Sequence, residues 1–208
     1  MGTMAPATAK GRGTRERIVL AATELVGERG VAGTSLDAVG ERAHASKGQL
    51  YHYFTDRDDL MRAVARSTSD TVIAGQAELL AQVDTIDGIR AWIDAVVAMQ
   101  EQREARGGCP IGSLAGQLAE HDDGAREELA AGLERWESAI RAGLERMAAR
   151  GELRAEAEPA LLAQRTLAAA QGGLLLTQVR RDPGQLRAAL DGALETILAA
   201  RRDGEEPA

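Results

Sequence analysis

Aromatic residues are scarce in this chain of 208 residues: two Trp, two Tyr and one Phe make up 2% of it. Strands favour aromatic and β-branched residues, so a composition rich in Ala, Leu, Arg and Glu predicts an all-α fold. The only cysteine, Cys109, excludes an intrachain disulfide and is typical of the cytoplasm, where we expect the protein to act. The sequence has no run of eighteen apolar residues and no secretory signal at its start, so we expect no membrane partner.

The chain also lacks the clusters that mark catalytic or metal centres. Its His, Cys and acidic residues are not grouped at metal-ligand spacing, and it has no Gly-rich nucleotide loop. We therefore expect no metal, no cofactor and no enzymatic activity. An enzyme would need Cys109 as nucleophile and His121 as base, with no third group to orient the base. A Cys-dependent enzyme stays an alternative.

Positive charge is scarce overall, but it is unevenly distributed. The net charge is −7, which by itself argues against a nucleic-acid partner. Residues 1–66, however, contain ten Lys and Arg against eight Asp and Glu, and both lysines of the chain lie there. The acidic excess therefore belongs to the remainder, a distribution that favours a DNA-facing head and an acidic body.

Three of the few aromatic residues are adjacent, in the segment Tyr51-His52-Tyr53-Phe54. They close a stretch that reads as two short helices, 34–43 and 46–54, joined by a three-residue turn. Such a pair is typical of a helix-turn-helix. Capping boxes are expected at three places, in which a hydroxyl caps the helix start and the fourth residue reaches back: Thr34-x-x-Asp37, Ser46-x-x-Gln49 and Thr55-x-x-Asp58.

Hydrophobic periodicity extends the all-α prediction to about nine helices. Besides the pair above, they are expected at 14–29, 55–83, 86–106, 111–120, 122–150, 159–180 and 184–201. We expect a flexible basic arm at 1–13, a DNA-binding domain at 14–60, a ligand-binding and dimerisation domain at 61–202, and a disordered tail at 203–208.

The segment from Thr34 to Leu60, TSLDAVGERAHASKGQLYHYFTDRDDL, resembles the DNA-binding head of the TetR family of transcriptional repressors. The strongest part of this resemblance is the motif Leu50-Tyr51-His52-Tyr53-Phe54, followed by Asp58-Asp59-Leu60. His44 stands where most members have glycine, and we expect His to tolerate the positive φ of that turn. The segment at 108–113, GCPIGS, is similar to a subgroup associated with multidrug or flavonoid sensing.

The resemblance implies that helix 46–54 lies in the major groove of a double-stranded operator. Phe54 is expected in the core and Gln49 and His52 at base edges. The remaining expected DNA contacts go to the phosphate backbone, from Ser35, Lys47, Gly48, Tyr51 and Arg57. Lys10, Arg12 and Arg15 of the arm are expected to add minor-groove or phosphate contacts.

The resemblance further implies a homodimer whose DNA binding is opposed by a small apolar or aromatic effector. Helices expected to bound the effector cavity carry Trp92, Met99, Cys109, Leu114, Gln117, Trp136, Ile140 and Met147. The last two helices are expected to form a four-helix dimer interface through Leu161, Gly172, Gly173, Leu175, Leu186, Leu190, Leu194 and Ile197. An ordinary core is the alternative for both sets, and a redox response through Cys109 is an alternative to effector binding.

Overall fold

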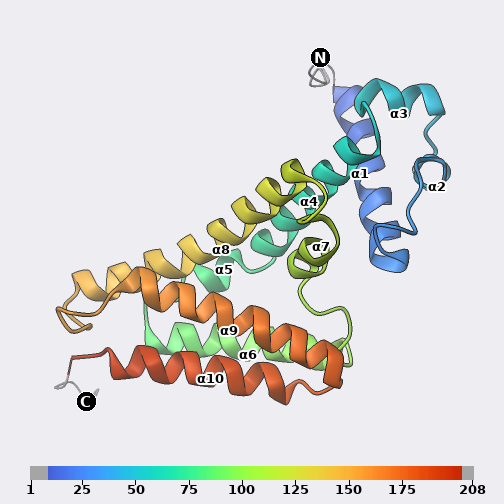
Figure 1. The fold of residues 1–208 in the computed structure, drawn as a ribbon. Helices are drawn as coiled ribbons and strands as arrows, with labels where there is room; N and C mark the ends of the chain where they lie inside the picture. The colour runs from blue at the N-terminus through green and yellow to red at the C-terminus, as the bar shows by residue number, and fades with distance from the viewer. Residues whose placement is uncertain (1–8, 203–208) are drawn as a thin grey trace. The chain divides into compact units, whose positions relative to one another are not determined.

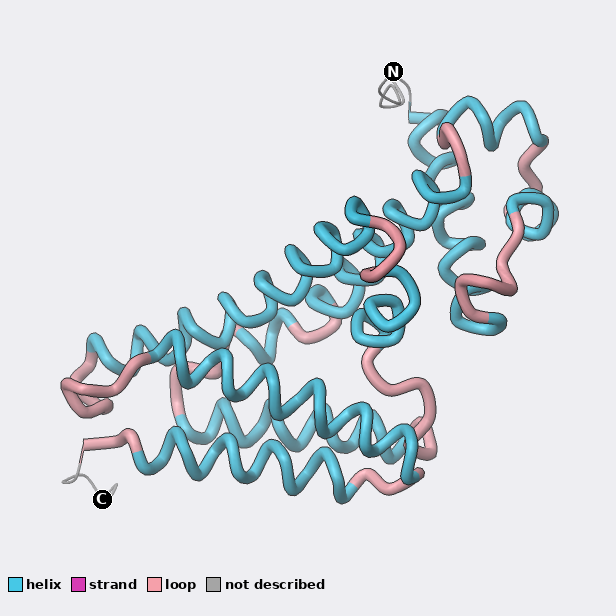
Figure 2. Tube along the Cα trace, in the orientation of Figure 1, coloured by secondary structure: helices cyan, strands magenta, loops and turns pink. Residues whose placement is uncertain are grey.

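A computed structural model describes residues 9–202, and these residues form ten α-helices and no β-strand (Figures 1 and 2). The all-α prediction is therefore confirmed. The helices are α1 (Ala9–Arg29), α2 (Leu36–Arg42), α3 (Lys47–Tyr53), α4 (Arg57–Ala74), α5 (Ala77–Leu80), α6 (Ile86–Gln102), α7 (Pro110–Leu118), α8 (Asp123–Ala149), α9 (Pro159–Arg180) and α10 (Gly184–Ala199). None of them is long and apolar enough to cross a membrane.

The sequence analysis predicted about nine helices, and the tenth is α5. A single helix was expected over 55–83, where the structure has α4 and α5. The structure ends α4 at Ala74 and turns the chain before α5. Gln76 lies in this turn, is 6% exposed, and accepts a hydrogen bond of 2.9 Å from the indole Nε1 of Trp92. The buried indole therefore has its partner in the turn, where hydrophobic periodicity alone gives no signal.

The chain separates into two compact units. The head unit comprises the residues up to 72 together with 113–132, and the body unit comprises 73–112 and the residues from 133 onward. The head unit therefore includes most of α7 and the first part of α8, which the sequence-based boundary after residue 60 assigned to the body. The expected tail at 203–208 and the first eight residues of the expected arm lie outside the described residues.

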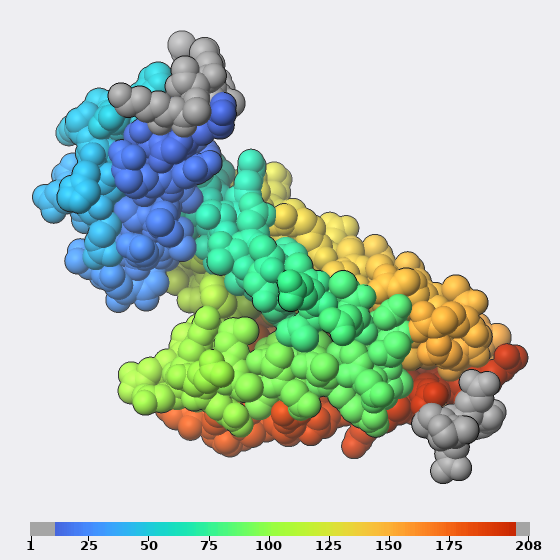
Figure 3. All heavy atoms as spheres, turned by 180° about the vertical axis from the view of Figure 1, so that it is seen from behind, coloured from blue at the N-terminus to red at the C-terminus, as the bar shows by residue number. Residues whose placement is uncertain are grey.

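The head unit is built on α1, whose apolar face is buried. Ile18, Ala22 and Leu25 of this face are at most 1% exposed, and Phe54 after α3 is 2% exposed, as predicted. The atoms of α1, α2 and α3 form a continuous surface in Figure 3. Residues 9–13 are helical and continue α1, so this part of the expected arm is ordered helix instead. Arg15 places its guanidinium 5.2 Å from the centre of the Phe54 ring, a cation–π contact inside the head.

Capping residues set the boundaries of the short helices. The expected box at Ser46 and Gln49 is present, with Ser46 Oγ accepting from Gln49 N and Gln49 Oε1 accepting from Ser46 N. The other two caps lie one residue later than expected. Ser35 Oγ accepts from Ala38 N at 3.2 Å, and Asp56 Oδ1 accepts from Asp59 N at 2.8 Å. Thr34 is instead buried and donates its hydroxyl to Gly30 O at 2.9 Å.

In the body unit, α9 and α10 form a closely packed antiparallel pair beside α6 (Figure 1). A Cβ at Gly173 would lie 2.9 Å from Leu186 Cδ1, so the glycine allows the close approach of α10. The contact buries Leu186, Leu190 and Ile197 almost completely.

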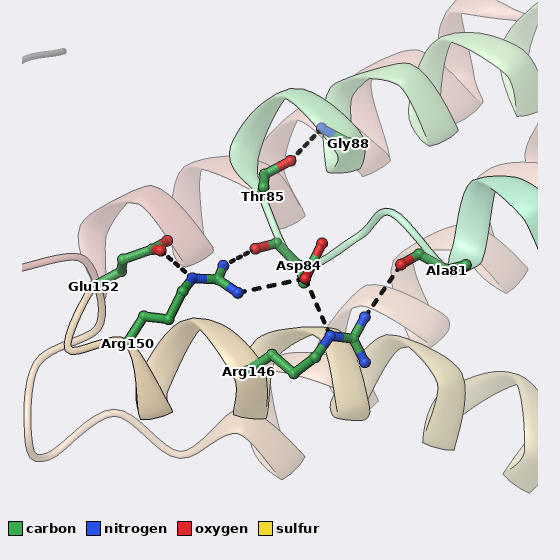
Figure 4. A network of polar contacts seen from close by, with 7 residues as sticks. All are labelled: Ala81, Asp84, Thr85, Gly88, Arg146, Arg150 and Glu152. Carbon is green, nitrogen blue, oxygen red and sulfur yellow. Dashed lines mark hydrogen bonds and ion pairs between the residues drawn. The ribbon is translucent and has the colours of Figure 1, made fainter. Parts of the chain in front are cut away.

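Asp84 joins the start of α6 to the end of α8 (Figure 4). Its carboxylate accepts from Arg146 Nε at 3.1 Å and from Arg150 Nη1 at 3.4 Å, while Arg150 also binds Glu152. The hydrogen bond from Arg146 and the positive charges of both arginines lower the pKa of Asp84. Thr85 next to it caps α6 by accepting from Gly88 N at 3.0 Å.

Candidate nucleic-acid interface

Helix α3 exposes one polar face and buries the other. Lys47, Gly48, Tyr51 and His52 share a face because they are one residue or one helical turn apart, and all four are exposed. Leu50, on the opposite face, is 3% exposed and anchors α3 in the head core. Tyr51 is 52% exposed and therefore does not serve as a packing residue. The arrangement presents a cation, an imidazole and a phenol to the solvent on a short, capped helix.

Local contacts and backbone geometry position the exposed face of α3. The His52 ring contacts the Tyr53 ring edge to face, with centroids 4.8 Å apart and an interplanar angle of 75°. The turn before α3 contains His44 at φ 49°, so the expected positive φ is confirmed. At Gly48, an added Cβ would meet only Ser46 Oγ at 3.9 Å, so the space outside this backbone is open to a partner.

Gln49 takes part in a capping box, and this contact competes with the expected reading of adenine, which stays a prediction. Its side-chain Oε1 is already bound to Ser46 N at 2.8 Å within the capping box. Bidentate pairing with adenine requires both the amide oxygen and the amide nitrogen. Gln49 would have to give up its cap to make that contact, so His52 is the better placed of the two expected base-reading residues.

Arg57, which was expected to hold a phosphate, is engaged inside the head. Its Nε donates to Thr34 O at 3.1 Å, and its Nη2 donates to Val31 O. The guanidinium thus fixes the loop between α1 and α2 to the start of α4. Ser35 keeps a position suited to a phosphate: it is exposed, and its hydroxyl proton is free because the oxygen acts as acceptor in the cap.

The same loop is also held from α7. Gln117 Oε1 accepts a hydrogen bond of 2.8 Å from Val31 N, and a Cβ at Gly30 would lie 3.1 Å from that oxygen. Gln117 was expected to line the effector cavity, but its amide oxygen faces the head loop. Sequence patterns could not reveal this contact, because the two residues are 86 positions apart.

The other expected cavity residues are divided between the units. Leu114 is buried in the head unit. The body unit contains Met99, which is half-buried, and five that are buried: Trp92, Cys109, Trp136, Ile140 and Met147. Trp92 is paired with Gln76, whereas the indole Nε1 of Trp136 has no hydrogen-bond partner among the residues that the structure describes.

Cys109 is 7% exposed, and its Sγ accepts from Gly112 N at 3.5 Å at the start of α7. Reactive thiols are found in accessible, electropositive surroundings, so this burial fits a structural thiol better than a redox sensor. Within the described residues, no group of three His, Cys, Asp or Glu side chains could hold a metal ion.

The expected dimer residues also fall into two groups. Gly173, Leu186, Leu190 and Ile197 are buried within the protomer, where they join α9 to α10, so they offer no surface to a partner. Leu161, Gly172 and Leu175 are exposed, and Leu194 is half-buried. Two further residues of α9 are exposed as well: Leu176 at 41% and Val179 at 72%.

A helix-turn-helix with an exposed polar face on its second helix is typical of DNA-binding transcriptional regulators. Residues 18–64 match the model of bacterial regulatory proteins of the tetR family, and residues 85–193 match the tetracyclin repressor-like C-terminal domain. The chain belongs to the TetR family of transcriptional regulators, which confirms the resemblance found in the head. The narrower likeness to a multidrug or flavonoid subgroup stays a prediction.

Individual relatives agree with this assignment. An uncharacterized HTH-type transcriptional regulator of Mycobacterium tuberculosis is 30% identical over 82% of this chain and 87% of its own length. The HTH-type transcriptional repressor DhaR of a Mycobacterium species is 23% identical over 88% of this chain and 92% of its own. The crystal structure of a TetR transcriptional regulator from Chloroflexus aurantiacus has a TM-score of 0.78 and 27% identity, covering 94% of this chain and 99% of that one.

Proposed function

We propose that this regulator binds a palindromic operator as a homodimer in the cytoplasm and leaves it when a small-molecule effector binds the body unit. The exposed face of α3 carries the proposal. Lys47 supplies positive charge for a phosphate, and His52 and Tyr51 supply polar groups for base edges or phosphates. The name of the relative DhaR, a transcriptional repressor, supports repression as the direction of control.

An apolar surface on α9 supports dimerisation. Leu175, Leu176 and Val179 are exposed within about one helical turn, and Leu161 lies further toward the start of the helix. Grouped exposed leucine and valine side chains are costly in water and mark protein interaction sites. A second copy of the same face is the simplest partner, because a two-fold axis pairs a patch with itself. Two recognition helices could then reach successive major grooves, about 34 Å apart.

The contacts of the α1–α2 loop support the proposal that a ligand in the body unit regulates DNA binding by the head unit. Helix α7 begins in the body unit and continues into the head unit, where Gln117 holds Val31. A ligand that binds one position of α7 better than another would change how this loop is held, and with it the population of heads that fit the operator. Because such coupling is reciprocal, operator binding would weaken effector binding by the same factor.

The test is a selection of bound sequences from a randomised DNA library, followed by measurement of the mass of the complex on the selected DNA. We expect an inverted repeat bound by two copies of the chain. The Lys47→Ala variant serves as a control for the phosphate contact of α3 and should enrich the same sequence with lower affinity under the same conditions. Enrichment of single half-sites bound by one copy would refute the dimeric operator, and a wild-type protein that enriches nothing would refute operator reading.

A further inference from the structure

The turn that joins the two helices of the helix-turn-helix is a Schellman motif. His44 N donates to Glu41 O at 3.2 Å, and Ala45 N donates to Gly40 O at 2.9 Å. These two bonds define the motif, together with a positive φ at the first residue past the end of the helix, where His44 has φ 49°. Since α3 begins three residues after His44, the geometry of this turn sets the direction of α3.

The residues of this turn give it less support than the motif usually has. Glycine is the usual residue at the positive φ, because it carries no Cβ, but His44 occupies this position. The motif often adds an apolar contact between the helix and the residue that follows, which here would join Gly40 to Ala45. Gly40 has no side chain for this contact, and a Cβ there would lie 3.1 Å from both Ala45 O and Leu50 Cδ1. The turn therefore depends on contacts from elsewhere in the head unit.

Arg17 of α1 supplies such a contact. Its Nε donates to the carbonyl oxygen of Ala43 at 2.9 Å, although the two residues are 26 positions apart. Ala43 is the C-cap of α2, and the last carbonyls of a helix have no donor within the helix. A cation at this end also interacts favourably with the helix dipole. Because the carbonyl of Ala43 belongs to the peptide bond before His44, Arg17 fixes the backbone at the residue with positive φ.

A second arginine joins the same end of α2 to α1, but it does so through exposed side chains. The guanidinium of Arg42 binds the carboxylate of Glu28 at 3.0 Å and that of Glu24 at 3.2 Å. Both glutamate side chains are 49% exposed, and exposed ion pairs contribute little to stability because water and salt screen them. These pairs also hold side chains only, whereas Arg17 holds the backbone of the turn.

We propose that Arg17 is a positioning residue for DNA recognition. Its bond to Ala43 O keeps His44 at positive φ, and the turn in that geometry keeps the exposed face of α3 in the orientation that reads the operator. This inference rests on the function proposed above. It gives Arg17 no contact with DNA, so the role of Arg17 depends on its Nε–H donor and not on its positive charge.

Two substitutions separate the donor from the charge. In Arg17→Gln, the amide Nε2 is as many bonds from Cα as the Nε of arginine, so it can donate to Ala43 O without a charge. In Arg17→Met, a methyl group takes that place and donates nothing. The control is Arg29→Gln at the end of α1, where the side chain is 53% exposed, because it removes the same charge from the head unit. All three variants keep unbranched side chains that suit a helix.

The first measurement uses the full chain without DNA. Amide hydrogen exchange reports the state of the turn through Ala45 N–H, which is bonded to Gly40 O. We expect this amide to exchange about tenfold faster in Arg17→Met, because a hydrogen bond from a charged donor is lost, and at the wild-type rate in Arg17→Gln and Arg29→Gln. An unchanged rate in Arg17→Met, or an equal increase in Arg17→Gln, would overturn the inference.

The second measurement compares affinities for the selected operator and for unrelated DNA at several salt concentrations. We expect Arg17→Met to bind the operator about tenfold more weakly per half-site, with the wild-type affinity for unrelated DNA and the wild-type salt slope. Arg17→Gln should bind like the wild type. Equal losses in the two variants with a reduced salt slope would make Arg17 a phosphate contact and refute the positioning role.

A double-mutant cycle tests whether Arg17 acts through His44. Glycine adopts positive φ without strain, so Arg17→Met should cost less operator affinity in a His44→Gly background than in the wild type. An undiminished cost would contradict the route through His44. A wild-type protein that selects no operator would refute the proposed function alone, because hydrogen exchange without DNA still decides whether Arg17 holds the turn.

Discussion

Gln117 and Val31 are joined by a hydrogen bond of 2.8 Å, in which the side-chain oxygen of Gln117 accepts from the backbone N–H of Val31. The carbonyl of Val31 in turn accepts from Arg57. A single residue of the α1–α2 loop is therefore held from α7 through its N–H and from α4 through its C=O. Its position in the head depends on two helices that lie outside the helix-turn-helix.

We predict that Gln117→Ala loosens this loop without unfolding the head. The lost hydrogen bond should lower the free energy of unfolding by about 1 kcal/mol. Amide hydrogen exchange gives the direct measurement, because Val31 N–H should exchange much faster in the variant while Leu25 N–H keeps its protection. Gln102→Ala, at an exposed position at the end of α6, is the control and should change neither amide. Equal exchange of Val31 N–H in both variants would show that the bond does not hold the loop.

Gln49 allows the cap and the base contact to be separated. Gln49→Glu keeps an oxygen for Ser46 N–H, and capping boxes accept Glu at this position, so the thermal stability should be preserved. Gln49→Ala should lower the free energy of unfolding by about 1 kcal/mol through loss of that bond. Glu at the exposed face should nevertheless weaken DNA binding by charge repulsion. If Gln49→Ala instead altered preference at one base pair and left stability unchanged, the amide would be reading DNA.

Lys47 and His52 should differ in how they contribute to DNA binding. Lys47→Ala is expected to weaken binding to all sequences and to reduce the slope of log K against log salt by about 1 per half-site, because a phosphate contact is lost. His52→Ala should cost about 1–3 kcal/mol at one position per half-site and leave other sequences less affected. Binding isotherms on the selected operator and on single-base variants, at several salt concentrations, distinguish the two. Identical patterns for both variants would contradict these roles.

The sequence predicted the order of the helices except for α5, but it placed two caps one residue early. Each real cap follows a threonine that also could have capped: Ser35 after Thr34, and Asp56 after Thr55. Two adjacent capping residues look equivalent in a pattern. The choice depends on tertiary contacts, since Thr34 donates to Gly30 O inside the head and cannot also lie at the exposed helix start.

Hydrophobic periodicity was likewise unable to separate the inner from the outer face of α9 and α10. Both helices carry apolar residues on two sides, so Leu186 and Leu190 looked as suitable for a partner as Leu175 did. The structure buries the first two against α9, because Gly173 lets α10 approach closely, and leaves Leu175 exposed. The roles of Gln117 and Arg57 could not be predicted either, since each depends on a backbone group far away in the sequence.

Asp84 should make the stability of the body unit depend on acid pH. Its folded-state pKa is lowered, so its carboxylate stabilises the fold above the ordinary pKa of Asp, and this contribution is lost as the pH falls through the lowered value. We expect Asp84→Asn to have a lower melting temperature than the wild type at pH 7 and a much smaller difference near pH 3. Asp87→Asn is the control, because that side chain is 94% exposed and its ion pair is with Arg90 on the same helix. A gap between wild type and Asp84→Asn that does not shrink in acid would contradict the assignment.

The apolar face of α9 gives the most direct test of dimerisation. Leu175 and Leu20 are both 59% exposed, the first on α9 and the second on α1 of the head. Placing a carboxylate at either position should leave the protomer folded, because neither side chain contributes to the core. In a dimer paired through α9, however, Leu175→Glu brings two carboxylates into an apolar interface, where their desolvation is not compensated. We therefore expect Leu175→Glu to sediment as a monomer and Leu20→Glu to sediment as a dimer, like the wild type.

The monomeric variant should also lose affinity for the inverted repeat although α3 is unchanged, because each half-site is then bound independently. A dimeric Leu175→Glu would move the interface away from this face.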